Sequence, residues 1–368
     1  MLAKGLAVTY SQSVAHSLTS AMPVVASNPM PALFKRLRKI GFDEAFLRTA
    51  VLPDWWNDDL AESPVTRSQI EMRVARRLGL PLADIADPSK TLQMPPAAGV
   101  RLKRAKASST LADITPGLTV ARNAVRQLVP CLRDMKLLPA YLTPEQLRTW
   151  IQGRQKVVDL AGLVEACWAH GIAVFHFAPL PEHAKRFAGV AYFEGTTPII
   201  ILASGWDSPP RLAYYLAHEI GHVLCGHVKP GGDVLADEDI DGGNADPQER
   251  EADDAAMILL TGHKTVELKP VSGLTAVKFC YSARELQAKT NVHAGTLVLI
   301  YGKTASRMPL AISALKLMNL DTGGRAIIAE ALQRHLLSVA QEGDHPLADI
   351  PGPVLELLHL FGINSAGD

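Results

Sequence analysis

The chain has 368 residues, with 37 basic and 37 acidic side chains, so its formal net charge is zero. This balance argues against a protein that binds nucleic acid over its whole length. Hydrophobic residues make up 48% of the chain and charged residues 20%, which allows a buried core and excludes wholesale disorder. At roughly 100–200 residues per domain, the length suggests two or three domains.

The cysteines and the apolar segments indicate the cellular compartment of the protein. Cys131, Cys167, Cys225 and Cys280 are far apart and form no CxxC pair, which favours reduced thiols over a disulfide framework. No stretch approaches the roughly 20 apolar residues that a membrane helix needs. Polar residues interrupt the sequence after Lys4, where a signal peptide would have its apolar segment. We therefore expect a cytoplasmic protein that makes no membrane contact.

The first 150 residues show helical patterns separated by breakers. Residues 31–83 carry apolar stripes at helical spacing, and helix returns over residues 118–151. Between them, residues 84–117 are predicted to form a Pro-rich linker. The linker carries a basic run: Arg101, Lys103, Arg104 and Lys106. Such a run is typical of a solvated loop, and weak contact with DNA is the alternative.

The middle of the chain alternates helix and strand. Residues 157–170 predict a helix, and residues 172–177 predict a strand. Residues 189–193 and 198–203 predict two more strands joined by a short turn. A helix is expected after Ser208, which is a plausible N-cap followed by two prolines. After a loop rich in Gly and Asp, another helix is expected from Asp-Pro at positions 246 and 247, and the chain is largely helical from about residue 266.

Residues 218–222, His-Glu-Ile-Gly-His, form an HExxH motif with apolar neighbours. At about 100° per residue, His218 and His222 lie about 40° apart and one turn apart, so both imidazoles can bind one metal ion from the same side. Glu219 lies about 100° round the helix, where it can take a proton from a water on the metal without being a ligand. Zinc fits because a catalytic zinc keeps one position open for water. The alternative is a chance match on a surface helix.

A third protein ligand is expected from the helix that begins after the Asp-rich loop. With Ala252 set at 0°, the apolar residues of this helix fall between about −60° and +80°, and Glu249 falls inside that arc at about +60°. A carboxylate on a buried face should be paired or bound to a metal, so Glu249 is predicted as the ligand. Glu251, at about −100°, is the fallback. Asp253, one turn after Glu249, is predicted to hold the second ring nitrogen of a liganding histidine.

Three residues near the motif also have structural interpretations. With Asp246 as the N-cap, Glu249 could complete a capping box, which does not exclude metal binding. His227 is predicted to point away from the site face if the helix continues that far, and to be a residue of the helix end rather than a ligand. Cys225 shares the face of the motif but lies further along, and is expected to be a small buried hydrophobe.

Together, these elements resemble a known family. A helix, a strand, a short hairpin, the HEIGH helix and then Glu-Arg-Glu-Ala-Asp at 249–253 are similar to the ImmA/IrrE family of zinc metallopeptidases. The resembling stretch runs from about residue 155 to 262, under a third of the chain. Family members usually carry Asn at the position of Asp253, a departure that leaves the predicted zinc ligands intact.

The resemblance implies a gluzincin-like fold and a biological role. It implies limited proteolysis of a protein partner, commonly a helix-turn-helix repressor or an antitoxin, in stress response, mobile-element control or a toxin–antitoxin pair. Two other functions stay open. One is a transcriptional regulator or toxin that uses the metallopeptidase fold mainly to bind protein or DNA. The other is an aminopeptidase, although no obvious acidic pair is present to hold a substrate amine.

The predicted fold class is α+β, with a small mixed sheet packed on the HExxH helix in a zincin-like arrangement and mainly α-helical N- and C-terminal regions. We divide the chain into three parts. Residues 1–117 form a mainly helical region that ends in the linker. Residues 118–265 form the zincin-like metallopeptidase domain with its preceding helices, and residues 266–368 form a C-terminal helical domain.

Overall fold

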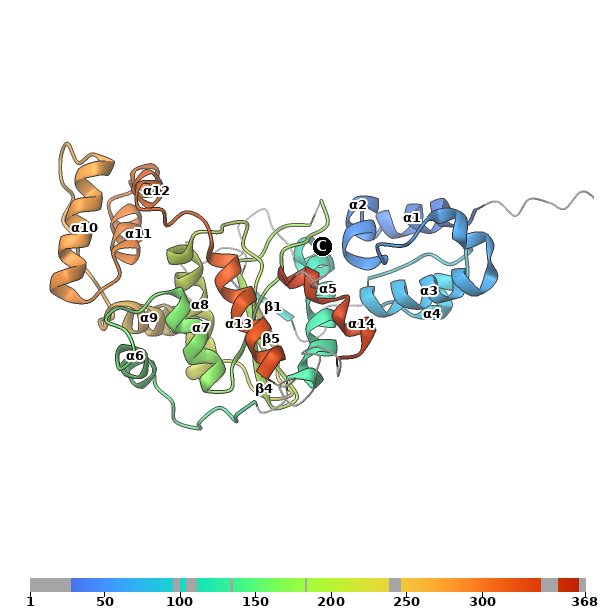
Figure 1. The fold of residues 1–368 in the computed structure, drawn as a ribbon, viewed down its shortest axis with the longest axis horizontal. Coiled ribbons are helices and arrows are strands. Elements are labelled where there is room, and N and C mark those ends of the chain that lie inside the picture. Colours follow the sequence, from blue (N-terminus) through green and yellow to red (C-terminus); the bar gives the residue numbers. More distant parts are fainter. Residues whose placement is uncertain are drawn as a thin grey trace, which may run out of the picture.

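The computed structural model describes residues 28–94, 100–103, 111–132, 135–182, 184–237, 246–338 and 350–363. These residues form an α+β fold in which a small mixed sheet lies in the middle and helical regions lie at both ends (Figure 1). The predicted fold class is therefore confirmed. None of the described helices is long and apolar enough to cross a membrane.

The N-terminal helices pack around an apolar core. The longest of them, α3, begins after the N-cap Ser63 and ends at Gly79, which adopts the left-handed conformation that commonly terminates helices. Its buried face presents Ile70, Val74 and Leu78, which are four residues apart, the helical spacing that predicted a helix here. The elements of this region are α1 (Met30–Arg38), α2 (Glu44–Phe46), η1 (Leu47–Val51), η2 (Asp58–Glu62), α3 (Pro64–Leu78) and α4 (Leu82–Ala86).

The stretch predicted to be a linker contains regular structure. Strand β1 (Val100–Lys103) pairs with the sheet, and α5 (Leu111–Leu128) begins well before residue 118. Pro116 lies inside α5, where the burial of Ile114 and Leu118 on one face outweighs the local cost of proline. Of the basic run, Arg104 and Lys106 lie outside the described residues, so DNA contact through this segment stays a prediction.

Within the described residues, the sheet has five strands in the order β1-β5-β3-β4-β2. Strand β3 is antiparallel to both of its neighbours, β4 and β5, whereas β2 is parallel to β4 and β1 is parallel to β5. The strands predicted from the alternating and apolar runs are β2 (Ala173–His176), β3 (Gly189–Glu194) and β4 (Thr197–Leu202); β5 (Val234–Asp237) was not predicted. The Ile-Ile-Ile-Leu run of β4 at 199–202 is fully buried, because helices cover this part of the sheet.

Two helices, α8 (Pro209–Leu224) and α9 (Pro247–Thr261), carry the candidate site, and two others, α6 (Pro144–Gln152) and α7 (Leu160–Ala169), pack against them. Helix α8 carries the HExxH motif and packs against β3, β4, α7 and α9. Two caps have side-chain hydrogen bonds: α6 begins with a capping box between Thr143 and Gln146, and α9 begins after Asp246, whose carboxylate accepts a hydrogen bond from the backbone of Gln248. Ser208 occupies the predicted N-cap position of α8, but its hydroxyl donates to the carbonyl of Leu320 instead of capping the helix.

Close approach of α8 to α9 depends on Gly221, the glycine inside the HExxH motif. A Cβ atom at this position would lie 2.7 Å from the carbonyl oxygen and 2.9 Å from the Cα atom of Ala252 on α9. Both neighbours are backbone atoms, so neither can move aside without shifting the helix. The absence of a side chain therefore allows the two helices that carry the candidate ligands to touch.

We expect Gly221→Ala to lower the free energy of unfolding by about 1–3 kcal/mol, the usual cost of overpacking a core. Chemical denaturation of the metal-free protein measures this change. The control is Gly352→Ala, since a Cβ atom there meets nothing within 4 Å. Equal stabilities of the two variants would contradict the packing argument.

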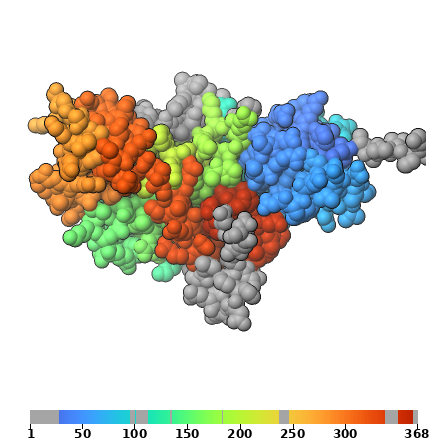
Figure 2. Space-filling model, turned by 45° about the horizontal axis from the view of Figure 1, so that its top comes forward, coloured from blue at the N-terminus to red at the C-terminus, as the bar shows by residue number. Residues whose placement is uncertain are grey.

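The C-terminal helices pack against two separate cores. Side chains of α10 (Ala276–Thr290), α11 (Ala294–Thr304) and α12 (Met308–Leu317) form a core of their own. Those of α13 (Gly324–Ser338), α14 (Gly352–Leu355) and η4 (Leu358–Phe361) join the main core. Figure 2 shows α10–α12 in orange at one end of the molecule and the N-terminal helices in blue at the other. The domain boundaries proposed from the sequence stay predictions.

Candidate metal centre

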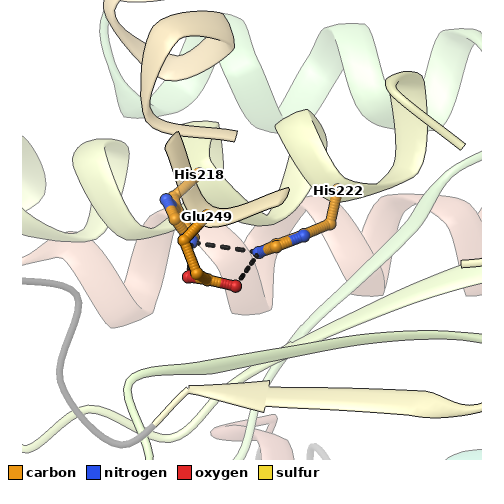
Figure 3. A group of neighbouring side chains, drawn as sticks. All are labelled: His218, His222 and Glu249. Atoms are coloured by element: carbon orange, nitrogen blue, oxygen red, sulfur yellow. Dashed lines mark hydrogen bonds and ion pairs between the residues drawn. The ribbon is translucent and has the colours of Figure 1, made fainter. Parts of the chain in front are cut away.

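Two adjacent helices bring three ligand-type side chains together. His218 and His222 come from α8 and Glu249 from the first turn of α9, and all three are fully buried. The Nε2 atoms of the two histidines are 3.1 Å apart. The Glu249 carboxylate lies beside both, with Oε2 at 3.4 Å from His218 Nε2 and Oε1 at 3.5 Å from His222 Nε2. Figure 3 shows the three side chains converging on one point.

These separations fit a tetrahedral metal ion. Zinc bonds of about 2.0–2.1 Å at tetrahedral angles would separate two ligand atoms by about 3.3 Å. The observed separations of 3.1, 3.4 and 3.5 Å lie close to that value. Two imidazole nitrogens and one carboxylate are also a ligand set that leaves a fourth position of zinc open. The residues present therefore fit a catalytic type of zinc site.

Asp253 holds the outer nitrogen of His218, as the sequence predicted. Its Oδ1 atom is 3.0 Å from His218 Nδ1. An ionised carboxylate can only accept a hydrogen bond, so Nδ1 of His218 carries the proton and Nε2 keeps its lone pair. This contact fixes both the orientation of the ring and the nitrogen that is presented to a metal.

The outer nitrogen of His222 is held by a residue that the sequence argument misplaced. His227 Nδ1 lies 2.9 Å from His222 Nδ1, and His227 Nε2 lies 3.0 Å from Glu251 Oε2. His227 was expected to point away because five residues of helix turn a side chain by about 140°. Helix α8 ends at Leu224, so the helical angle does not apply to His227. The Gly at 226, two residues after the end of the helix, was the signal that could have shown this.

The two contacts that link His222 to His227 and His227 to Glu251 fix the tautomer of His222. With the Glu251 carboxylate as acceptor, His227 carries its proton on Nε2 and accepts a hydrogen bond at Nδ1 from His222. His222 then presents the lone pair of Nε2 to the interior, as His218 does. Two lone pairs and a carboxylate thus meet at distances of 3.1–3.5 Å, an arrangement that a cation stabilises. Glu251, the fallback ligand, lies outside this group.

Glu219 lies beside the site with its carboxylate buried against the sheet. Its side chain is fully buried and contacts the backbone of β3 at Gly189, where any larger residue would overlap the Glu219 carboxylate. Strand β3 thus restricts where this carboxylate can go. Glu219 follows His218 on α8 and is turned by about 100° from the ligand face; its role as a general base stays a prediction.

A cavity of about 410 Å³ lies between α8, α9 and α11, next to Asp253. Asp253 and Tyr214 line it, whereas none of the three converging side chains does. The Tyr214 hydroxyl donates a hydrogen bond of 3.5 Å to Asp253 Oδ1 and lies 3.4 Å from Lys303 Nζ on α11. Asp253 is therefore linked to α11 as well as to His218.

We expect Asp253→Ala to weaken zinc binding by about 10–100-fold, the usual effect of removing the outer partner of a histidine ligand. Asp253→Asn should retain most of the affinity, because its amide oxygen still accepts a hydrogen bond from His218 Nδ1. Competition with a chromophoric chelator measures both. The control is Glu285→Ala, which removes an exposed carboxylate on α10 that pairs with Lys289. Unchanged affinity in Asp253→Ala would show that Asp253 does not hold His218 in the metal-binding orientation.

A small mixed sheet packed on a helix that supplies two histidines and a glutamate, with a carboxylate from the next helix, defines a metallopeptidase-like domain. Residues 167–267 match the model of the Peptidase_M78 family, described as the IrrE N-terminal-like domain. This match covers β2 to β5 and both helices of the site, and it confirms the resemblance to the ImmA/IrrE family. No curated protein and no solved structure was found to match the chain.

Proposed function

We propose that this protein is a zinc-dependent endopeptidase that makes a limited cut in a regulatory partner. The observation that carries the proposal is the convergence of His218, His222 and Glu249 at distances that fit one tetrahedral zinc ion. The buried Glu219 beside them adds the group that hydrolysis needs. The IrrE N-terminal-like domain supports a peptide bond as the target.

Each residue has a role that follows from its position. His218, His222 and Glu249 would hold the zinc, which supplies a Lewis acid and lowers the pKa of a water to roughly 7. Asp253 and His227 keep the two imidazoles in the tautomer that presents Nε2. Glu219 takes the proton of the attacking water and delivers it to the leaving amine. Burial of all four central side chains keeps bulk water away from these charges.

The proposed partner is a helix-turn-helix transcriptional repressor or an antitoxin. The support is the likeness of residues 167–267 to the IrrE N-terminal-like domain, together with the ImmA/IrrE resemblance of the HEIGH helix and of the helix after it. Cutting such a partner would serve stress response, mobile-element control or a toxin–antitoxin pair. The helical regions outside the matched residues would provide the surface that selects the partner.

Co-expression with the product of the neighbouring gene, followed by mass spectrometry, tests this function. We expect a single cut in the partner that disappears when the cells are grown with a zinc chelator. Metal analysis of the purified protein should give about one zinc per chain. An intact partner, together with salt-dependent DNA binding and no bound metal, would favour the regulator instead.

A further inference from the structure

A second group of ligand-type side chains lies next to the candidate metal centre. Cys225, His227 and Glu251 place a sulfur, a ring nitrogen and a carboxylate oxygen within 4.8 Å of one another. Cys225 is partly exposed and Glu251 is exposed, whereas the His227 side chain is only 5% exposed, so a cation would reach the group from the side of Cys225 and Glu251. This group contains none of the three residues of the buried centre.

The end of α8 creates this group. The helix stops at Leu224, and Gly226 adopts a positive φ of 73°, which favours glycine and reverses the direction of the chain. The backbone N–H of His227 then donates to the carbonyl of His222 at 3.0 Å. As a result Cys225 and His227, on either side of Gly226, both face Glu251 on α9.

The charges around Cys225 favour a cation. Burial raises the pKa of its thiol to about 11, and the carboxylates of Glu251, Asp254 and Glu145 act in the same direction, with only Lys264 opposing them. Three negative groups against one positive group attract a divalent ion. Thiolate, imidazole and carboxylate together are a ligand set that zinc accepts.

We propose that Cys225, His227 and Glu251 form a second zinc site, weaker than the buried centre, through which excess zinc inhibits the protein. On binding, the Cys225 thiol releases its proton to solvent as the sulfur coordinates the ion. His227 coordinates through Nε2, and its proton moves to Nδ1. Glu251 gives up its hydrogen bond to His227 and binds the ion through a carboxylate oxygen.

This second ion would disturb the first through His227. When Nδ1 of His227 carries a proton, two N–H groups face each other across the 2.9 Å that separates it from Nδ1 of His222. The hydrogen bond that holds His222 is then lost, so its ring is no longer fixed at the buried centre, and the activity falls by about 10-fold or more, as for loss of an outer partner. Inhibition rests on the proposed function, whereas the second site does not.

Titration of the full-length, metal-free protein with Co²⁺ tests the site. The buried centre has no sulfur ligand, so the first equivalent should give visible bands without thiolate charge transfer. The second equivalent should add an intense near-ultraviolet band from a thiolate bound to cobalt. Cys225→Ser should bind the first equivalent and lose this band, and Glu251→Ala should weaken it. Cys131→Ser, which removes another partly exposed thiol, should keep it.

The outcomes separate the two proposals. Visible bands with no thiolate band in the unmodified protein would overturn the second site and leave the proposed function intact. Absence of any cobalt binding would overturn both. Partner cleavage measured with one and with ten equivalents of Zn²⁺ gives the regulatory readout. In the unmodified protein we expect cleavage with ten equivalents to be about 10-fold slower than with one equivalent. In Cys225→Ser we expect the two rates to be nearly equal.

Discussion

Glu219→Gln should bind as much zinc as the unmodified protein and cut its partner about 10²–10⁴-fold more slowly, the usual contribution of a general base. Glutamine has nearly the same shape as glutamate but cannot take a proton from water. The substitution leaves the three converging side chains in place and removes only the proton acceptor beside them. Metal analysis and the rate of partner cleavage, measured on the same preparation, check the two halves of this expectation.

The control for this experiment is Glu285→Gln on α10. Glu285 is exposed and pairs with Lys289 one turn away, on a helix whose buried side chains belong to a separate core. It changes the net charge by the same amount without touching the site. If Glu219→Gln retains its zinc and cleaves at a rate near that of Glu285→Gln, Glu219 is not the general base.

The centre could be predicted from sequence because its geometry is local to two helices. The spacing of His218 and His222 fixes their relative direction once α8 is a helix. The apolar arc of α9 then selects Glu249 over Glu251, because only one of these carboxylates shares the buried face. The position of Asp253 one turn after Glu249 places it beside the other ring nitrogen of His218. Each of these steps needs only helical periodicity and burial.

Local sequence patterns do not predict the structure where it depends on contacts between distant segments. Strand β1 joins the sheet through backbone pairing with β5, which no local pattern of residues 84–117 signals. Pro116 looked like a breaker, but burial of the apolar face of α5 decides its structure. His227 was misplaced because periodicity was extended past the end of α8. In each case a tertiary contact or a chain reversal outweighed the local signal.

The close contact between α8 and α9 links the fold to the chemistry. Gly221 lies between the two histidines in sequence and against Ala252 in space, so the residue that permits helix contact is part of the motif itself. Glu249 lies one turn before Ala252, on the same buried face. The separation of the two helices at this point therefore sets the distances between the carboxylate and both imidazoles. Small residues at 221 and 252 are needed for the metal geometry as well as for packing.

Glu249→Ala should weaken zinc binding by more than about 100-fold, beyond the range typical of outer partners. The change removes one of three protein ligands and leaves two imidazoles facing an apolar gap. Its effect appears in the stabilisation that zinc gives against unfolding. At a zinc concentration 100 times the dissociation constant of the unmodified protein, that stabilisation is about 2.7 kcal/mol, and a 100-fold loss of affinity reduces it to about 0.4 kcal/mol.

Glu251→Ala is the matched comparison, since Glu251 lies two residues away on the same helix and acts on the centre only through His227. A loss of about 10-fold in affinity would leave about 1.4 kcal/mol of zinc stabilisation under the same conditions. Thermal or chemical unfolding with and without zinc therefore ranks the two carboxylates directly. A larger loss in Glu251→Ala than in Glu249→Ala would mean that the ion is held at the helix end rather than between the two buried histidines and Glu249.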